Sequence, residues 1–552
     1  MKRIRHFICL LLIVALCLQA IPVAAKSSTN VTEKNKEDTL TTKGELHGFY
    51  PSYLTFSEDI KKYIDNLDSI SFAFSKIDGK EATYWNTVKA KNGNYDFYYP
   101  TDYMLPIEYA KSQGKPIQLN VYMNGSDGIT LLPDKNARKV IIKEIIKSMK
   151  TDLLEGKQIY YDGVVIDFEG LRDTNSNKEP ILYKGKPIST YYTQFLKELK
   201  KQLDPLGKKL YAAVNPALYY DGYNYTEILD IADRVILMAH DYDPSENLKK
   251  SHIKQYTGYD SLNPVHSLSP IQMVRRALND LQEAAADKNQ LSKVWLQLNF
   301  DAAQWQFDVK DADGWMELSD NTLSRGRRIS PLYKTIKARV DNTDGYAKNM
   351  TYGYNNELQS PFIQYYNSFD KSWNVIIYED STSLLAKIEL AKSYNLGGIS
   401  LWSLYNIPDY KDKVGKKFHL NGWSTIITAM KSYKSASPGS KEYITFKDPV
   451  IEQAVREKLG KASGKISVLE LKSIYRIKLP EGVKSLKDLK NLSNLEYLDA
   501  NKLNVSDISA IGSLKNLKVL YLTHNKLSDV KALKNFNKIE LLFLNGTKII
   551  PK

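Results

Sequence analysis

The sequence predicts an α/β protein: a (β/α)8 TIM barrel carrying an inserted α+β lobe, followed by a small C-terminal leucine-rich-repeat solenoid. Two observations predict this fold class. Apolar, strand-like runs alternate with amphipathic helical runs over residues 44–434, as in parallel strands joined by helical crossovers. After residue 446 the pattern changes, and leucines recur with a fixed period of 22 residues. The 552 residues are enough for two such domains.

Eight predicted strands account for the barrel, and most carry apolar residues on both faces, as strands of a buried parallel sheet do. They span residues 46–50, 69–74, 117–122, 163–169, 210–215, 235–240, 294–300 and 398–402. Predicted helices between them include residues 136–154, 191–203, 270–286 and 381–393. A doubly wound open sheet is the alternative, but no glycine-rich phosphate loop follows any of these strands.

Length and composition define the remaining segments. Residues 301–380 are too long for a simple connection and are expected to form the inserted lobe, with a hairpin around residues 362–378. Residues 26–43 are rich in Lys, Thr, Asn and Glu and are predicted to be a disordered linker. Residues 435–446, which include Ser-Ala-Ser-Pro-Gly-Ser, form a second linker. Residues 447–552 are the repeat domain.

The N-terminus has the features of a secretory signal peptide over residues 1–25. Lys2, Arg3 and Arg5 precede an apolar stretch, and small residues follow at the expected cleavage site. An uncleaved membrane anchor is the alternative, although Gln19 and Pro22 interrupt the apolar run. No later segment is long and apolar enough to span a bilayer, so we expect no membrane span in the mature chain.

Cysteine content and charge limit the chemistry and the partners. Cys9 and Cys17 both lie inside the signal, so the mature chain is expected to contain no cysteine. This excludes disulfides, thiolate nucleophiles and cysteine-based zinc sites, and we expect neither a metal nor another cofactor. The net charge is +14, of which the signal supplies +3. A basic secreted protein can adhere to anionic wall polymers, but the charge is scattered along the sequence, which ordinary solubility also explains. Nucleic acid is the rival partner, but the sequence contains no nucleic-acid-binding motif.

The repeat domain is predicted from columns of apolar residues. Leu495, Leu517 and Ile539 are spaced by 22 residues, and further columns follow the same period. Residues 517–527 match the leucine-rich-repeat consensus. Residues 448–459 are expected to form a capping helix, because an open solenoid end exposes its core. Cap and repeats resemble those of internalin-like bacterial surface proteins, which implies a protein partner for this domain.

The decapeptide at residues 161–170, Tyr-Asp-Gly-Val-Val-Ile-Asp-Phe-Glu-Gly, is the main functional signal. Alternate residues of a strand share a face, so Asp167 and Glu169 point the same way as Val165. Burial of carboxylates at the end of a strand costs free energy, so their presence there indicates a function. A strand-end cap is the alternative. Asp162 has the opposite parity and is expected to be a turn acid.

Other predicted strands also end in polar or aromatic residues, and in a barrel these ends converge on one mouth. Carboxylates suit acid catalysis, and an aromatic ring suits the floor of a sugar subsite. The candidate sugar ligands are Met238, His240 and Tyr242 on the sixth strand, Trp402 on the eighth, Asn215 on the fifth, and Gln297 and Asn299 on the seventh. Residues that fit either the core or a subsite are Tyr50, Phe72 and Tyr122.

This pattern resembles glycoside hydrolase family 18, the chitinase and endo-N-acetylglucosaminidase family, over about residues 44–434. The Asp-Gly-x-Asp-x-Asp-x-Glu signature on the family's fourth strand is matched at Asp162, Gly163, Asp167 and Glu169. The resemblance implies a family 18 barrel with its catalytic acids on this strand.

Two further elements support the resemblance. The Met-x-Tyr-Asp element of the family's sixth strand is matched at Met238 and Asp241, and its closing Gly-Gly-Ile-x-x-Trp strand is matched at residues 397–402. Tyr-Glu-Asp at residues 378–380, with Ser383, further resembles the bacterial spore and cell-wall branch.

The resemblance implies substrate-assisted retaining hydrolysis, an exception to two-carboxylate schemes. Glu169 is expected to protonate the glycosidic oxygen while the 2-acetamido oxygen of the substrate attacks the anomeric carbon. Asp167 would orient the acetamido N–H and stabilise the developing positive charge. Asp241, with His240 or Tyr242, would hold the acetamido carbonyl.

Two positions depart from the family pattern. Val165 replaces the middle acid of the signature, so Asp167 lacks a like-charged neighbour and is expected to ionise more readily by electrostatics alone. His240 replaces a tyrosine, which makes the pH profile depend on an imidazole. Activity is expected to survive both changes.

We therefore expect a secreted bacterial glycosidase, extracellular or cell-wall associated, that cleaves β-1,4-linked N-acetylglucosamine-containing glycans. The branch resemblance and the basic charge favour peptidoglycan over chitin. One alternative is a lectin-like barrel without turnover, but such barrels usually lack the acid that is present here as Glu169. Another is an adhesin in which the leucine-rich repeats are the working part.

Overall fold

The computed structural model describes residues 43–78, 87–91, 96–100, 102–240, 242, 247–251, 267–325, 330–411, 418–433, 443–472 and 474–549. The predicted signal peptide, most of both predicted linkers and Asp241 fall outside these residues. Among the described residues, no helix is long and apolar enough to cross a membrane.

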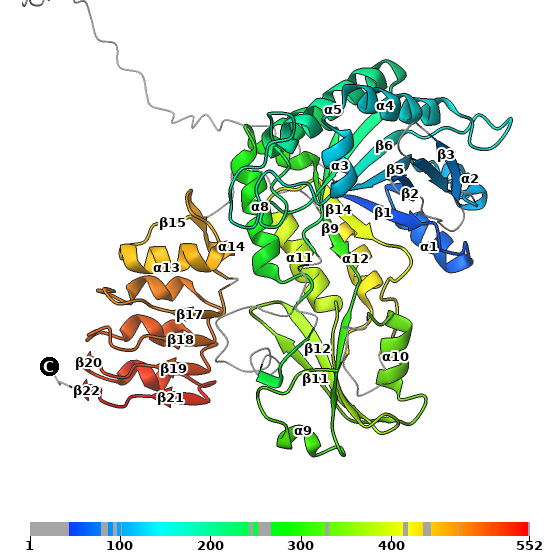
Figure 1. The fold of residues 1–552 in the computed structure, drawn as a ribbon. Coiled ribbons are helices and arrows are strands. Elements are labelled where there is room, and N and C mark those ends of the chain that lie inside the picture. Colours follow the sequence, from blue (N-terminus) through cyan, green and yellow to red (C-terminus); the bar gives the residue numbers. More distant parts are fainter. Residues whose placement is uncertain are drawn as a thin grey trace, which may run out of the picture. The chain divides into compact units, whose positions relative to one another are not determined.

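Eight parallel strands form a closed barrel, which confirms the predicted fold class (Figure 1). Their order around the barrel is β1-β14-β9-β8-β7-β6-β5-β2, and pairing of β1 with β2 closes it. Each predicted strand overlaps one of them. The strands are β1 (Glu45–Pro51), β2 (Ser69–Asp78), β5 (Ile117–Asn124), β6 (Gly163–Glu169), β7 (Lys209–Val214), β8 (Arg234–Leu237), β9 (Val294–Asn299) and β14 (Gly398–Trp402).

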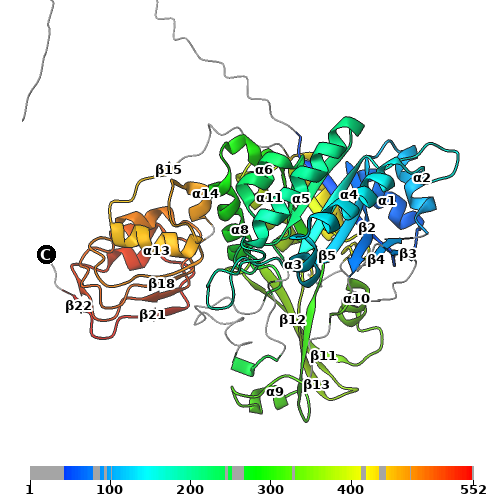
Figure 2. The ribbon, with the colours of Figure 1, turned by 45° about the horizontal axis from the view of Figure 1, so that its top comes forward.

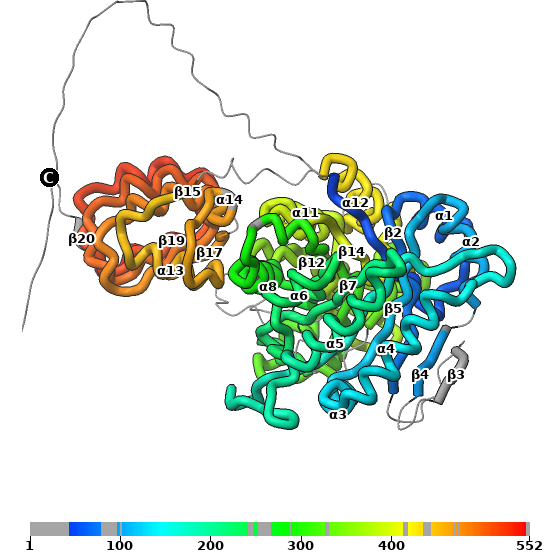
Figure 3. Tube along the Cα trace, turned by 90° about the horizontal axis from the view of Figure 1, so that it is seen from above, coloured from blue at the N-terminus to red at the C-terminus, as the bar shows by residue number. Residues whose placement is uncertain are grey.

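Helices surround the barrel on its outer side (Figure 3). The sequence supplies caps for several of them: Ser57 accepts from the backbone N–H of Ile60, and Asp134 accepts from that of Ala137. The helices are α1 (Glu58–Asn66), α2 (Met104–Ser112), α3 (Gly125–Leu131), α4 (Lys135–Lys150), α5 (Ile188–Leu203), α6 (Tyr225–Ile231), α8 (Ile271–Ala284), α11 (Ser381–Ser393) and α12 (Gly422–Lys431).

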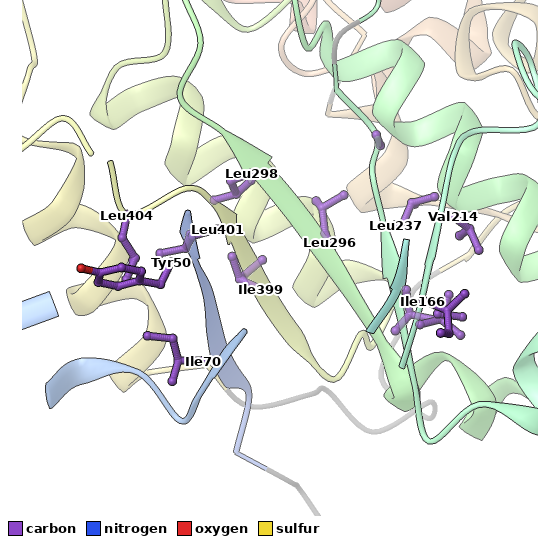
Figure 4. Packing of buried hydrophobic residues seen from close by; sticks show 14 of the residues in the cluster. Tyr50, Ile70, Ile166, Val214, Leu237, Leu296, Leu298, Ile399, Leu401 and Leu404 are labelled. Atoms are coloured by element: carbon purple, nitrogen blue, oxygen red, sulfur yellow. The ribbon is translucent and has the colours of Figure 1, made fainter. Parts of the chain in front are cut away.

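Alternate residues of the barrel strands belong to two different cores. Outward side chains such as Ile166 and Leu296 pack against the helices in one large cluster (Figure 4). This confirms the parity predicted for β6, in which Val164, Ile166 and Phe168 point outward and Val165 inward. The inward cluster consists of Phe49, Ala73, Val165, Tyr211, Ala213, Ile236, Met238 and Trp295.

The long interval between β9 and α11 forms a lobe, as predicted. Its antiparallel sheet has the order β10-β13-β12-β11 and extends away from the barrel helices (Figure 2). The lobe elements are β10 (Ala303–Asp308), α9 (Gly314–Glu317), α10 (Tyr333–Asp341), β11 (Ala347–Asn355), β12 (Ser360–Asn367) and β13 (Ser372–Ile377), and β12–β13 is the predicted hairpin. A second antiparallel pair, β3 (Thr87–Lys91) and β4 (Asp96–Pro100), extends β2 and was not predicted.

The C-terminal repeats stack as successive coils with their own hydrophobic core. Leu498, Leu520 and Leu542 are paired in register, so the 22-residue period of the sequence becomes one coil per repeat. The predicted cap is α13 (Pro449–Leu459). Asp448 is the N-cap residue of this helix, and Gly460 is its C-cap residue, with a left-handed backbone conformation. The parallel strands are β17 (Arg476–Lys478), β18 (Tyr497–Asp499), β19 (Val519–Tyr521) and β21 (Leu541–Phe543).

Candidate active site

Strand β6 carries the two predicted acids to its C-terminal end. Asp167 is buried, with 5% of its surface exposed, and Glu169 is the last residue of the strand and is partly exposed. At the other end, Gly163 lets β6 approach β7 closely, because a Cβ there would lie 2.6 Å from the carbonyl oxygen of Lys209. The strand thus fixes both carboxyl groups on the inward face of the barrel.

Asn120 on β5 holds Asp167 in place. It lies in register with Val165 of β6, and its Nδ2 donates to Asp167 Oδ2 over 3.0 Å. The motif did not predict this residue, because the contact joins strands whose residues are 47 positions apart. The available signal was an amide side chain within the apolar run at residues 117–122.

The surroundings of Asp167 shift its protonation. Burial raises the pKa of Asp167 to about 6, although hydrogen bonds with Asn120 and Glu169 and the charge of His240 oppose the rise. Val165 lies among apolar and aromatic side chains on the same inward face. The sequence predicted that Asp167 ionises more readily because the middle acid is missing. Desolvation in the barrel interior acts in the opposite direction, and it is the largest influence on the pKa of Asp167.

His240 lies just beyond β8 and faces two polar residues of β9. Its Nε2 is 2.6 Å from Gln297 Oε1, and its Nδ1 is 3.4 Å from Asn299 Nδ2. Because an amide oxygen only accepts, Nε2 of His240 carries the proton that is donated to Gln297. Asn299 also donates to Asp301 Oδ2 over 3.2 Å, so the polar chain continues to the end of the strand.

An aromatic group faces the acids from the opposite wall. Trp402 ends β14, its ring lies edge-on to Phe49 at 5.3 Å, and it stacks on Phe74 at 6.0 Å between centroids. Packing of this kind fixes the plane of the indole. A fixed and partly exposed indole suits the floor of a sugar subsite.

Asn215 connects β7 to the residue that follows Glu169. Its Oδ1 accepts from the backbone N–H of Gly170 over 3.1 Å and from the Tyr223 hydroxyl over 2.8 Å. Among the described residues, none accepts from its Nδ2, which leaves that group for a ligand in the cavity. Asn215 therefore both positions the strand end and lines the site.

These groups surround one cavity of about 410 Å³. The volume suits a short stretch of glycan. Seven of the predicted site residues line it: Asp167, Glu169, Asn215, Met238, His240, Gln297 and Trp402. Tyr122, which fitted either the core or a subsite, also lines it, and the lining residues that sequence reasoning missed are Phe49, Phe74, Ala213, Pro216, Tyr219 and Tyr220.

Three predicted site residues do not join this set. Asn299 contacts His240 from β9, and Asp241 lies outside the described residues. Tyr242, predicted to bind substrate, is instead buried in the wall of the barrel, where its hydroxyl donates to the carbonyl oxygen of Met273. The chain leaves the strand conformation after Leu237, so strand parity no longer decides where Tyr242 points.

Three other residues have the structural roles that the sequence allowed. Asp162 accepts from the backbone N–H of Ile117 over 2.8 Å and pairs with Lys111 at 3.0 Å, at the N-terminal end of β6. Tyr50 and Phe72 belong to the core between strands and helices. Asp162 is thus a turn acid, as predicted.

Comparisons with known proteins give the family. Residues 36–406 match the family described as Glycosyl hydrolases family 18, and residues 493–535 match Leucine Rich repeats (2 copies). The chain belongs to glycosyl hydrolase family 18. A cortical fragment-lytic enzyme of Bacillus subtilis (strain 168) is 24% identical over 284 residues, covering 50% of this chain and 52% of that protein.

Two further proteins are similar to this chain. A cortical fragment-lytic enzyme of Bacillus cereus is 23% identical over 315 residues, covering 54% of this chain and 60% of that protein. The chain thus spans between half and two thirds of the length of these curated relatives. The crystal structure of the spore cortex-lytic enzyme SleL of Bacillus megaterium QM B1551 has 17% sequence identity and a TM-score of 0.47, covering 70% of this chain and 74% of that one.

The segment that resembles the cell-wall branch of family 18 builds the start of α11. Asp380 caps this helix by accepting from the backbone N–H groups of Thr382 and Ser383. Glu379, just before the helix, is buried and forms an ion pair at 2.8 Å with Lys387 in the second turn of α11. These residues do not line the cavity, and their contacts hold the start of α11.

Proposed function

We propose that this barrel is a glycosidase that cleaves β-1,4-linked N-acetylglucosamine-containing glycans by substrate-assisted retention. The observation that carries the proposal is the common cavity of Asp167, Glu169 and Trp402, with Asp167 fixed by the amide of Asn120. A lectin-like barrel without turnover would not require a buried carboxylate beside a proton donor.

The reaction divides into two steps. Glu169 donates its proton to the glycosidic oxygen, the bond from that oxygen to the anomeric carbon breaks, and the acetamido oxygen of the same sugar bonds to the anomeric carbon. The product is an oxazolinium ion, whose N–H and positive charge face the Asp167 carboxylate. Glu169 then accepts a proton from water as the water oxygen attacks the anomeric carbon and reopens the ring.

The remaining polar groups would hold the acetamido sugar. Gln297 accepts from His240, so its amide nitrogen is oriented as a donor, and Asn215 presents its Nδ2. Asp241 and His240 are proposed to hold the acetamido carbonyl. Met238 contributes an apolar side chain to the lining of the cavity. Trp402 supplies the flat apolar face that a pyranose ring covers.

Peptidoglycan is the proposed substrate class, in preference to chitin. The curated relatives are named as cortical fragment-lytic enzymes, and the net charge of +14 favours anionic polymers. We further propose that residues 1–25 are a signal peptide and that the protein acts outside the cell, in or near the wall.

The variant Glu169→Gln tests the catalytic assignment. Removing the proton donor should lower kcat by about a thousandfold, within the range expected of general acid catalysis. The matched control is Glu179→Gln, which changes an exposed glutamate of the following loop. Mass spectrometry of products from purified peptidoglycan and from chitin oligomers identifies the cleaved bond. Full activity of Glu169→Gln would refute the assignment.

A second function is proposed for the repeat domain, which is binding of a protein partner. On the open face of its sheet, the rings of Tyr521 and Phe543 lie parallel at 4.3 Å, and Leu541 is 46% exposed. The two rings are half-buried, and aromatic and apolar groups that are at least partly accessible are enriched where proteins bind. The double variant Tyr521→Ala/Phe543→Ala should lose adhesion to protein-bearing surfaces and keep hydrolysis, whereas undiminished adhesion would refute this function.

A further inference from the structure

A cationic side chain lies beside the proposed proton donor. Arg172 follows Glu169 by three residues, a stretch of chain that reaches at most about 10 Å. Its side chain is exposed, and the guanidinium carbon lies 4.6 Å from the centre of the Tyr220 ring. Because Tyr220 lines the cavity, the positive charge stands at the mouth of the site.

The backbone on both sides of Arg172 is held in place. Leu171 is fully buried, and its carbonyl oxygen accepts from the backbone N–H of Gly222 over 3.1 Å. The backbone N–H groups of Asp173 and Thr174 donate to Asp221 Oδ1 over 2.8 and 3.2 Å. The loop after β6 is therefore fastened to the loop after β7, and the guanidinium is fixed by stacking rather than left to sample many rotamers.

The neighbouring carboxylates do not neutralise this charge. Asp173 Oδ1 accepts from the backbone N–H of Ser189 over 2.9 Å, and Asp221 is occupied by the loop contacts just described. Within the described part of the chain, no carboxylate forms an ion pair with Arg172. A stacked guanidinium that keeps its donor edge free is preorganised to bind a carboxylate through two parallel hydrogen bonds.

Topology places Arg172 on the same wall of the site as the proposed proton donor Glu169. In the strand order, β14 and β6 are separated by β9, β8 and β7 in one direction and by β1, β2 and β5 in the other. Trp402 and Glu169 thus stand on opposite walls of the barrel. If one sugar of the cleaved bond lies on Trp402, the next sugar extends towards Tyr220 and Arg172.

We propose that Arg172 determines specificity by binding the carboxylate of the 3-O-lactyl group on the N-acetylmuramic acid residue next to the cleaved bond. The proposal rests on the proposed function, and it names the feature that separates peptidoglycan from chitin at this site. Chitin is uncharged and offers no carboxylate. In peptidoglycan the carboxylate is available on the lactyl group itself or, where a stem peptide is attached, on that peptide.

Binding to the inactive protein tests the proposal without turnover. The full chain carrying Glu169→Gln is compared with the double variant Glu169→Gln/Arg172→Gln by titration calorimetry. The probes are peptide-free glycan tetrasaccharides with free lactyl carboxylates, the same tetrasaccharides with these groups converted to methyl amides, and chitotetraose. Arg172→Gln should weaken binding of the carboxylate probe about tenfold at low salt and less at high salt. Affinity for the two uncharged probes should change less than twofold.

A matched control separates this effect from a general loss of charge. Lys208 also stands over a tyrosine, with its Nζ 5.8 Å from the Tyr160 ring, but it precedes β7 at the opposite end of the barrel. Lys208→Gln should leave all three affinities unchanged. Arg172→Lys should give an intermediate loss, because it keeps the charge and removes the bidentate geometry.

The outcomes distinguish the inference from the proposed function. Equal weakening of all three probes, or of none, overturns carboxylate recognition by Arg172. Weakening that appears only with a fourth probe, the tetrasaccharide with stem peptides attached to its lactyl groups, overturns the lactyl assignment. Hydrolysis by the unmodified protein is measured in parallel. Turnover that does not depend on Arg172 would support the glycosidase function and contradict the role of Arg172. Charge-dependent binding without any turnover would support the role of Arg172 and contradict the glycosidase function.

Discussion

Two neighbours of Asp167 act on its charge in opposite directions. Asn120 donates a hydrogen bond to the carboxylate and so favours the charged form, whereas burial above the apolar cluster of Val165 disfavours it. The net result is a pKa of about 6. Asp167 is thus only partly ionised at mildly acidic pH, and the hydrogen bond from Asn120 raises the ionised fraction.

Removal of the Asn120 amide should therefore move the acid limb of the activity profile. In Asn120→Ala the charged form of Asp167 loses a hydrogen bond, a contribution of about 1.5–3 kcal/mol for a charged acceptor. The pKa of Asp167 rises further by about 1–2 units, so kcat should fall by about sevenfold to eightyfold at pH 6 and recover partly at higher pH. The pH dependence of kcat measures this shift.

A control variant for this prediction removes a buried polar atom without removing a hydrogen bond. Ser75 is fully buried, and among the described residues no group bonds to its hydroxyl. Ser75→Ala should leave the acid limb in place. An unchanged acid limb in Asn120→Ala would show that the amide does not control the charge of Asp167.

His47 makes the stability of the barrel depend on pH. It is fully buried, with its two ring nitrogens 2.8 Å from the hydroxyls of Ser400 and Ser71. Burial lowers the pKa of His47 from 6.5 to about 3. Below pH 6.5 His47 is protonated in the unfolded chain but stays neutral in the folded barrel. The free energy of unfolding therefore falls towards pH 3 by up to about 1.4 kcal/mol per pH unit.

The variant His47→Gln should flatten this acid dependence, because glutamine can bond to both hydroxyls and does not titrate. Denaturant unfolding between pH 7 and pH 4 measures the slope. The matched control is His419→Gln, which changes a half-buried histidine of the same barrel. If the slope of His47→Gln equals that of the unmodified protein, His47 does not cause the acid sensitivity.

At the scale of elements, the sequence predicted what depends on local pattern and missed what depends on contacts between elements. The eight strands and the lobe hairpin were found because apolar runs and parity are local properties. Asn120 was missed because its partner lies on the neighbouring strand. Tyr242 was proposed as an alternative to His240, but it lies beyond the end of β8 at Leu237 and is buried in the barrel wall.

The start of α11 shows how a motif that looks functional can serve the fold. Asp380 Oδ1 accepts from two backbone N–H groups at 2.9 and 2.8 Å, and Tyr352 donates to its Oδ2 over 2.9 Å. Ser383 completes the capping box by accepting from the backbone N–H of Asp380. This cap joins the lobe strand β11 to the barrel helix α11.

Loss of the cap should destabilise the barrel and leave the chemistry intact. Asp380→Ala should cost about 1–2 kcal/mol in the free energy of unfolding, because buried donors at the helix start lose their acceptor. Asp380→Asn keeps an acceptor and should cost less. Denaturant unfolding gives the difference, and kcat/KM at 25 °C should stay within about twofold. A large loss of kcat/KM in a folded Asp380→Ala protein would assign the motif to the site instead.

At the scale of the whole molecule, the described part of the chain contains two large hydrophobic cores that are built in different ways. The barrel is built from eight strands that are far apart in sequence, and its core forms only when all of them are in place. The repeat core is built from neighbours 22 residues apart, so each coil stabilises the next one. Because the two cores share no residues, we expect them to unfold in separate transitions.

Asn525 allows these transitions to be separated, because it belongs only to the repeat core. Its side chain is buried, its Nδ2 donates to the carbonyl oxygens of Ala500 and Leu522, and its Oδ1 accepts from the backbone N–H of Val505. Asn525→Ala leaves these groups unsatisfied, which should cost about 3 kcal/mol and lower one calorimetric transition. The other transition and the hydrolysis of glycan should remain unchanged. Leu296→Ala in the barrel should give the reverse result, since it creates a cavity only in the larger core. A single transition that both variants lower equally would show instead that the two domains fold as one unit.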